Sequence, residues 1–193
     1  MVRLLAFLFA TTLVCAQNKN AGNLELNVAP NSKLTLELSS GDYRIEPAPA
    51  DKLVIKSQTR NSAERRKVRF GLNAGPEEAS VKLDAPPNFA ATIQIPRTVN
   101  LNVRLNGGRL TMASIEGDKD IESNAGKLSI DVGHPEDYRT VDASVNVGEI
   151  DASAFHDAKS GVQQSFAARG PGRYRLHVHV DTGQIRLFTS DAL

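Results

Sequence analysis

One stretch of this chain, residues 124–130, reads NAGKLSI, and its pattern recurs along the sequence. In each copy, Asn, Asp or Ser stands first and Gly third, and apolar residues stand fifth and seventh. Because Gly accepts positive φ and the polar side chain can bond nearby backbone, the chain turns sharply at each copy. Further copies read NGGRLTM at 106–112, NVGEIDA at 146–152 and DTGQIRL at 181–187, with a looser SSGDYRI at 39–45. The residues expected to form the turns are Gly41, Asn106, Gly108, Asn124, Gly126, Asn146, Gly148, Asp181 and Gly183.

Between the turns, apolar and polar residues alternate. The runs 24–28, 34–38, 101–105 and 176–180 each place an apolar residue at every second position, which is the period of a strand with one buried face. The sequence therefore predicts an all-β protein, with single helical turns allowed at 61–67 and 155–168.

Two architectures satisfy these turns. In a β-solenoid or β-helix, each turn is a corner of a coil, and stacked rungs bury a shared interior. In a β-sandwich, each turn joins two strands of a hairpin. We expect a β-solenoid-like repeat with additional N-terminal antiparallel strands, and the β-sandwich is the alternative. The 35 residues between Gly148 and Gly183 leave room for an excursion at 155–172.

The start of the chain reads as a signal peptide at residues 1–16. Arg3 supplies a positive charge, residues 4–14 form an apolar run, and a small-residue cleavage site precedes Gln17. The single cysteine, Cys15, lies within this segment. Lipid anchoring at Cys15 is a minor alternative, because Val14 stands where a small residue is wanted. We therefore expect an exported protein, either periplasmic or secreted, with no transmembrane segment in the mature chain.

The remaining chain is expected to be one continuous domain, made of an N-terminal β-strand region at 17–96 and a Gly-turn repeat region at 97–193. The 193 residues carry a formal net charge of +1 without a dominant basic stripe, so nucleic acid is not an expected partner. Aromatic residues make up 5% and Trp is missing, which argues against a platform of stacked aromatic rings for sugars or single strands.

Several of these runs resemble a known family. IQIP at 93–96, VNLNVRL at 99–105, IEG at 115–117 and NAG at 124–126 are similar to the bacterial putative-adhesin family, whose exported domain of unknown function carries repeated Gly-x-Ile turns. Residues 170–174 and 181–185 resemble that family's closing repeat. The resemblance implies a β-solenoid-like fold in a cell-envelope protein, with a binding or structural role and no catalytic residues to carry over. The insert at 155–172 departs from a simple repeat.

A short polar series on one strand offers metal ligands. His177, His179 and Asp181 alternate with apolar residues, so they share one face, and two histidines two residues apart suit a metal ion. A solvated strand face needs polar residues at the same positions. We therefore expect no metal and no other cofactor, with these three as the candidate ligands if a metal binds.

Acidic residues could instead serve a carbohydrate-active enzyme on a β-helix, acting on polysaccharide. The candidates are Asp118, Asp120, Asp131, Glu149 and Asp151. Exposed strands commonly carry such residues for solubility, and the sequence has no nucleophile elbow or phosphate-binding loop. We expect no catalytic residue and no enzyme activity.

The favoured hypothesis is an exported, non-catalytic binding or scaffold protein of the bacterial cell envelope, similar to the adhesin family. Its partner would be a protein or glycan in the envelope or outside the cell. A basic cluster could meet acidic glycans or lipid head groups, although nearby glutamates dilute its charge. The members of this cluster are Arg60, Arg65, Arg66, Lys67 and Arg69. The β-helical enzyme is the alternative, and stacking of copies through exposed sheet ends is a third possibility; the sequence leaves the oligomeric state open.

Overall fold

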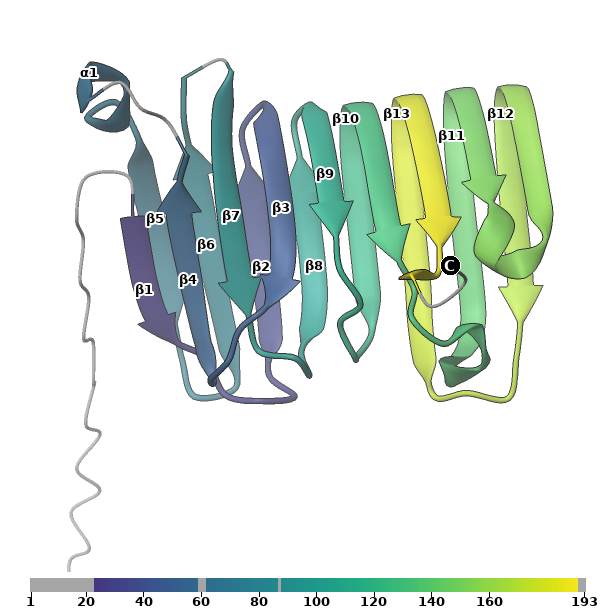
Figure 1. Ribbon diagram of the computed structural model, residues 1–193, viewed down its shortest axis with the longest axis horizontal. Coiled ribbons are helices and arrows are strands. Elements are labelled where there is room, and N and C mark those ends of the chain that lie inside the picture. Colours follow the sequence, from purple (N-terminus) through teal and green to yellow (C-terminus); the bar gives the residue numbers. More distant parts are fainter. Residues whose placement is uncertain (1–22, 59–61, 87, 191–193) are drawn as a thin grey trace, which may run out of the picture.

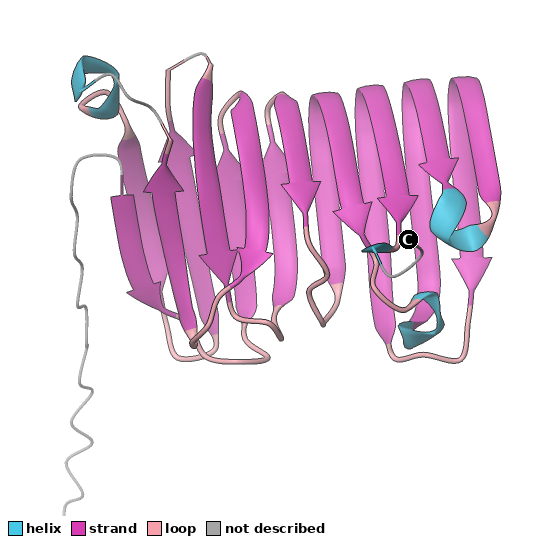
Figure 2. Ribbon diagram, in the orientation of Figure 1, coloured by secondary structure: helices cyan, strands magenta, loops and turns pink. Residues whose placement is uncertain are grey.

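The computed structural model describes residues 23–58, 62–86 and 88–190. The expected signal peptide and Cys15 therefore lie outside the described residues. Strands form nearly all of the regular structure, which confirms the all-β class (Figure 2). In the described ranges, the helical elements are α1 (Ser62–Arg65), at the predicted position, and two 3-10 turns at Pro135–Asp137 and Ser153–Phe155.

The strands belong to one sheet that folds back on itself into two layers (Figure 1). Layer 1 contains, in spatial order, β5 (Arg69–Ala74), β6 (Glu78–Asp84), β2 (Lys33–Leu38), β8 (Asn100–Leu105), the first halves of β10 (Lys119–Asp131), β13 (Tyr174–Phe188) and β11 (Tyr138–Ala152), and the second half of β12 (Asp157–Arg169). Layer 2 contains β1 (Asn23–Asn27), β4 (Lys52–Ser57), β7 (Phe89–Ile95), β3 (Gly41–Pro47), β9 (Gly108–Met112) and the other halves of β10, β13, β11 and β12.

The central strands of each layer are parallel, whereas antiparallel pairs occur toward the ends of the sheet. β5 pairs antiparallel with β6, β4 with both β1 and β7, and β12 with β11. The N-terminal strands are therefore only partly antiparallel, because β2 and β3 pair parallel with β8 and β9 and continue the repeat region.

The glycine turns carry the chain from layer 1 to layer 2. The turn glycines of adjacent rungs lie side by side in register, in the order Gly41, Gly108, Gly126, Gly183 and Gly148. At Gly126, φ is +128° and a Cβ atom would lie 1.9 Å from the carbonyl oxygen of Gly108. Glycine is required there, because any side chain would collide with the backbone of the next rung.

The spatial order of the rungs differs from their order along the chain. β13 lies between β10 and β11, so the last repeat of the sequence sits beside the repeat of Gly126. The helical turn allowed at 155–168 is wrong, because β12 occupies this segment and pairs along its length with β11. Pairing with β11 favours a strand here, and the local sequence of the segment does not show that such a partner is present.

The core lies between the layers, and parallel register lines it with continuous rows. One inner row of layer 1 joins Leu36, Val103, Ile121, Val178 and Ala143. An inner row of layer 2 joins Ile45, Met112, Ile130 and Leu187. Each of these residues is at most 2% exposed, so burial of aliphatic rows stabilises the whole stack.

Candidate functional site

The outer side of layer 1 carries polar side chains in two registered rows. The same alternation that buries Ile121 directs its neighbours Asp120 and Glu122 outward. Six positions before each turn glycine, the row reads Thr35, Asn102, Asp120, His177 and Asp142 across the strands. Four positions before it, the row reads Glu37, Arg104, Glu122, His179 and Ser144.

Charged pairs tie these rows together around Arg104. Its Nη2 lies 3.3 Å from Asp120 Oδ2, and its Nη1 lies 2.9 Å from Glu122 Oε1, the latter as an ion pair outside hydrogen-bond geometry. Asn102 Nδ2 also donates to Asp120 Oδ2, at 3.0 Å. Asp120 Oδ1 is buried and has no hydrogen-bond partner.

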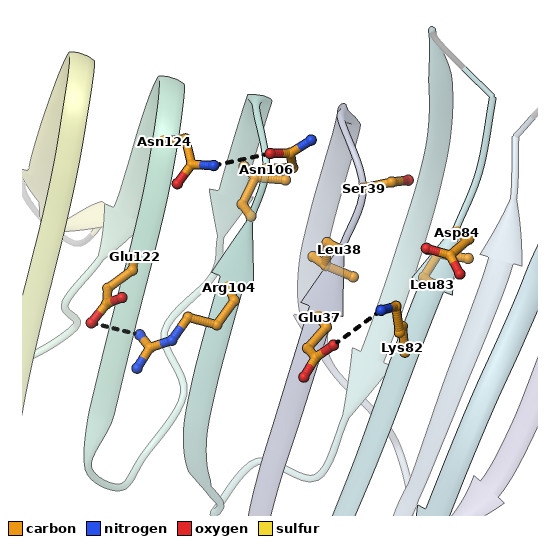
Figure 3. A pocket seen from close by; sticks show the side chains of 11 residues that line it. Glu37, Leu38, Ser39, Lys82, Leu83, Asp84, Arg104, Asn106, Glu122 and Asn124 are labelled. Atoms are coloured by element: carbon orange, nitrogen blue, oxygen red, sulfur yellow. Dashed lines mark hydrogen bonds and ion pairs between the residues drawn. The ribbon is translucent and has the colours of Figure 1, made fainter.

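Two depressions mark this face. The larger has a volume of about 740 Å³ and extends over β8, β10, β13 and β11. The smaller, of about 360 Å³, extends toward β2 and β6, and Glu122 lines both. Figure 3 shows the smaller one, with Arg104 directed at Glu122, Lys82 at Glu37 and Asn124 at Asn106.

The larger depression is acidic, and we call it the acidic groove. Its lining includes the carboxylates of Asp118, Asp120, Glu122 and Asp142. The exposed cations of its lining are Lys33 and Arg175. Arg175 is held by Asp118, whose Oδ2 accepts from Nε at 3.1 Å and from Nη2 at 3.0 Å. Such a forked ion pair fixes the guanidinium at the groove's lower edge.

Of the three candidate metal ligands, His179 and Asp181 lie together, whereas His177 belongs to a different cluster. His179 bonds to Ser144 Oγ at 2.8 Å and lies 3.3 Å from Asp181 Oδ1, which also accepts from Asn146 Nδ2 at 2.8 Å. His177 instead lies with two residues of β10. Ligand atoms of Asp120, Glu122 and His177 all lie within 4.8 Å of one another.

The turn amides bond across rungs. Asn124 Nδ2 donates to Asn106 Oδ1 at 3.0 Å, which parallels the bond between Asn146 and Asp181. The expected turn residues therefore lie together along one edge of the stack, where Asn106 and Asn124 line the smaller depression.

The five acidic candidates do not converge. Asp118 and Asp120 lie on layer 1, whereas Glu149 and Asp151 lie on the second half of β11 in layer 2. Asp131 is buried, and its Oδ2 accepts a 2.6 Å hydrogen bond from Ser190 Oγ. The basic cluster lies at and after α1, at the far end of the stack, with Arg60 outside the described residues (Figure 1).

Sequence reasoning missed one charged residue in the core. Lys119 occupies an inner row between Leu101 and Leu176, is 2% exposed, and donates from Nζ to Tyr138 Oη at 2.9 Å and to the Gly117 carbonyl at 3.0 Å. Burial lowers the pKa of Lys119 to about 8, and burial also raises the pKa of the Tyr138 hydroxyl. The sequence alternation could have indicated this burial, because Lys119 lies two residues before Ile121 and so faces the same side of the strand.

Comparisons with known proteins bear on the fold. The chain matches no protein-family model and no curated protein sequence. Its structure is similar to the crystal structure of a "putative cell adhesion protein" from Clostridium sporogenes, with a TM-score of 0.56 and 13% sequence identity. The match covers 87% of this chain and 99% of that chain. The two chains share a fold.

That likeness agrees with the family resemblance expected from the sequence, and at this identity it extends to the architecture alone. In the part of the chain that the structure describes, no helix is long and apolar enough to cross a membrane.

Proposed function

We propose that this chain is an exported, non-catalytic binding protein of the bacterial cell envelope, and that it holds an extended glycan against the outer face of layer 1. The observation that carries the proposal is the registered row of Asn102, Asp120, His177 and Asp142 in the acidic groove. Neighbouring strands lie about 4.8 Å apart, so the row offers hydrogen-bonding groups at regular intervals. A chain of hydroxyl-bearing sugars can lie along such a row.

The charge of the groove selects among glycans. Its four carboxylates accept hydrogen bonds, and Asp142 is an exposed one among them, so the groove suits the hydroxyl and amino groups of neutral or amino-sugar glycans. The open, shallow shape supports a long ligand held by many contacts. The likeness to a protein described as a cell adhesion protein supports the binding role.

The arrangement of the carboxylates supports a role without catalysis. A glycosidase needs two carboxyl groups facing the sugar from opposite sides. Here all four carboxylates of the groove belong to one face of the sheet, and Asp118 is held by Arg175 and Asp120 by Arg104.

A glycan array tests the ligand class. The purified chain is compared with Asp142→Lys, which reverses an exposed charge in the groove, and with Asp42→Lys, its match on the exposed side of β3 in layer 2. We expect binding to neutral or amino-sugar glycans, weakened roughly tenfold or more by Asp142→Lys and kept by Asp42→Lys. Equal loss in both variants, or binding of basic proteins but no glycan, contradicts the proposal. New reducing ends on a bound glycan would favour the enzyme alternative.

Protease treatment of cells carrying a C-terminally tagged copy tests export. Loss of the tag from intact cells places the chain outside the cell. A tag that survives in intact cells and is released by osmotic shock places it in the periplasm. Retention of the tag in the cytoplasmic fraction contradicts the proposal.

A further inference from the structure

We propose that Asp120, Glu122 and His177 form a binding site for a divalent transition-metal ion such as Zn²⁺. The parallel pairing of β10 with β13 places Asp120 directly beside His177, and Glu122 follows on the same face of β10. One ligand atom from each of the three lies within 4.8 Å of the others, so one ion can contact all three. The metal site shares Asp120 and His177 with the proposed glycan surface, but it does not depend on a glycan, and a zinc titration without glycan tests it alone.

An unsatisfied oxygen points to a missing partner at this place. Asp120 Oδ1 is buried without a hydrogen bond, and a native carboxylate oxygen in that condition calls for an ion or a water. Arg104 and Asn102 contact the other oxygen, Oδ2, so they leave Oδ1 available. His177 contributes an exposed imidazole, for which no ion pair or hydrogen bond occurs among the described residues.

The neighbours of the three ligands suit outer-shell roles. Arg104 lies 2.9 Å from Glu122 Oε1 and 3.3 Å from Asp120 Oδ2, so it orients both carboxylates. Such second contacts fix the direction of a ligating carboxylate and partly balance its charge.

The donor set selects the ion. Imidazole suits Zn²⁺, Cu²⁺ and Ni²⁺, whereas Ca²⁺ and Mg²⁺ prefer oxygen ligands throughout. Two carboxylates and one imidazole supply three protein ligands, and water can complete a tetrahedral Zn²⁺ site. On layer 2, β10 and β13 place Ser129 beside Arg186 three positions after the turn glycines, and this pair cannot form the set.

Titration with ZnCl₂ by isothermal calorimetry tests the site, on chain purified without a histidine tag and stripped with EDTA. We expect one saturable site, weakened roughly 10- to 100-fold or more in His177→Gln and in Asp120→Asn. His134→Gln is the matched control, because it removes an exposed histidine outside the cluster and should keep the wild-type affinity. In NMR spectra, the ring signals of His177 should move with zinc while those of His134 stay.

Three results would overturn the site: no saturable zinc binding by the wild-type chain, unchanged affinity in His177→Gln, or zinc binding lost equally in His134→Gln. A calcium titration that saturates equally in wild type and His177→Gln would assign the carboxylates to an oxygen-only site and also reject the proposal. Thermal unfolding without metal verifies the fold of each variant. If Asp120→Asn fails to fold, Glu122→Gln replaces it.

Discussion

The two outer faces of the stack differ although the same rungs build them. On layer 1, the row through Asp120 and His177 belongs to an acidic groove. On layer 2, the outward row three positions after the turn glycines reads Thr111, Ser129, Arg186 and Asp151. There Arg186 Nε lies 3.4 Å from Asp151 Oδ2, so its charges are paired within the row. The turns and the inner rows are common to both layers, so the outward residues can differ between the layers without changing the fold.

The largest effect is expected from a change at a turn glycine, because these turns connect the two layers. Gly126→Ala places a methyl group against the Gly108 carbonyl at a φ of +128°, which side chains rarely adopt. We expect a loss of about 3 kcal/mol or more in the free energy of unfolding, measured in urea. Gly75→Ala is the control, because its Cβ would have a nearest neighbour at 3.5 Å, and it should change stability by about 1 kcal/mol or less. Similar losses of stability in both variants would contradict a specific requirement for glycine at the turn.

The second prediction concerns Lys119, a charge in an inner row of layer 1. Its pKa of about 8 in the folded chain lies below the ordinary 10.5, so between these values the unfolded chain binds more protons. Stability therefore rises from pH 8 to pH 10, by an amount on the order of 2 kcal/mol. Above about pH 10, the raised pKa of Tyr138 opposes the rise, because the unfolded tyrosine loses its proton first.

Urea unfolding at several pH values checks this slope. Lys119→Met should flatten the rise between pH 8 and 10. Lys127→Met changes an exposed lysine of the same strand and should keep it. A wild-type chain whose stability is flat or falls over this window would contradict the buried, proton-losing lysine.

The smallest effect is expected at the turn edge. Asn124→Ala removes the 3.0 Å hydrogen bond to Asn106 at an exposed position. The loss should be about 0.5–1 kcal/mol in urea unfolding, since exposed hydrogen bonds contribute little net stability. Ser129→Ala on layer 2 serves as the control. A loss as large as that of Gly126→Ala would mean that the amide, rather than the glycine, holds the rungs together.

Much of this arrangement could be predicted from the sequence. Alternation predicts the strands, and alignment on the turn glycines places Asp120, Asp142 and His177 in one row, each six residues before its glycine. The sequence could not place His177 beside Asp120, because β13 inserts between β10 and β11. That choice depends on pairing between distant segments, including the antiparallel cover of β11 by β12. The local sequence pattern therefore could not show that His177 is the neighbour of Asp120 on the adjacent strand.

Glycan binding at the acidic groove is tested most directly by mapping where on the protein a glycan binds. Amide chemical shifts in NMR spectra, recorded while an array-selected glycan is added, report both faces at once. We predict shifts concentrated at 100–105, 119–125, 138–147 and 174–182, the halves of the rungs in layer 1. Shifts concentrated at 108–112, 126–131, 148–152 and 183–188 would place the ligand on layer 2 and contradict glycan binding at the acidic groove.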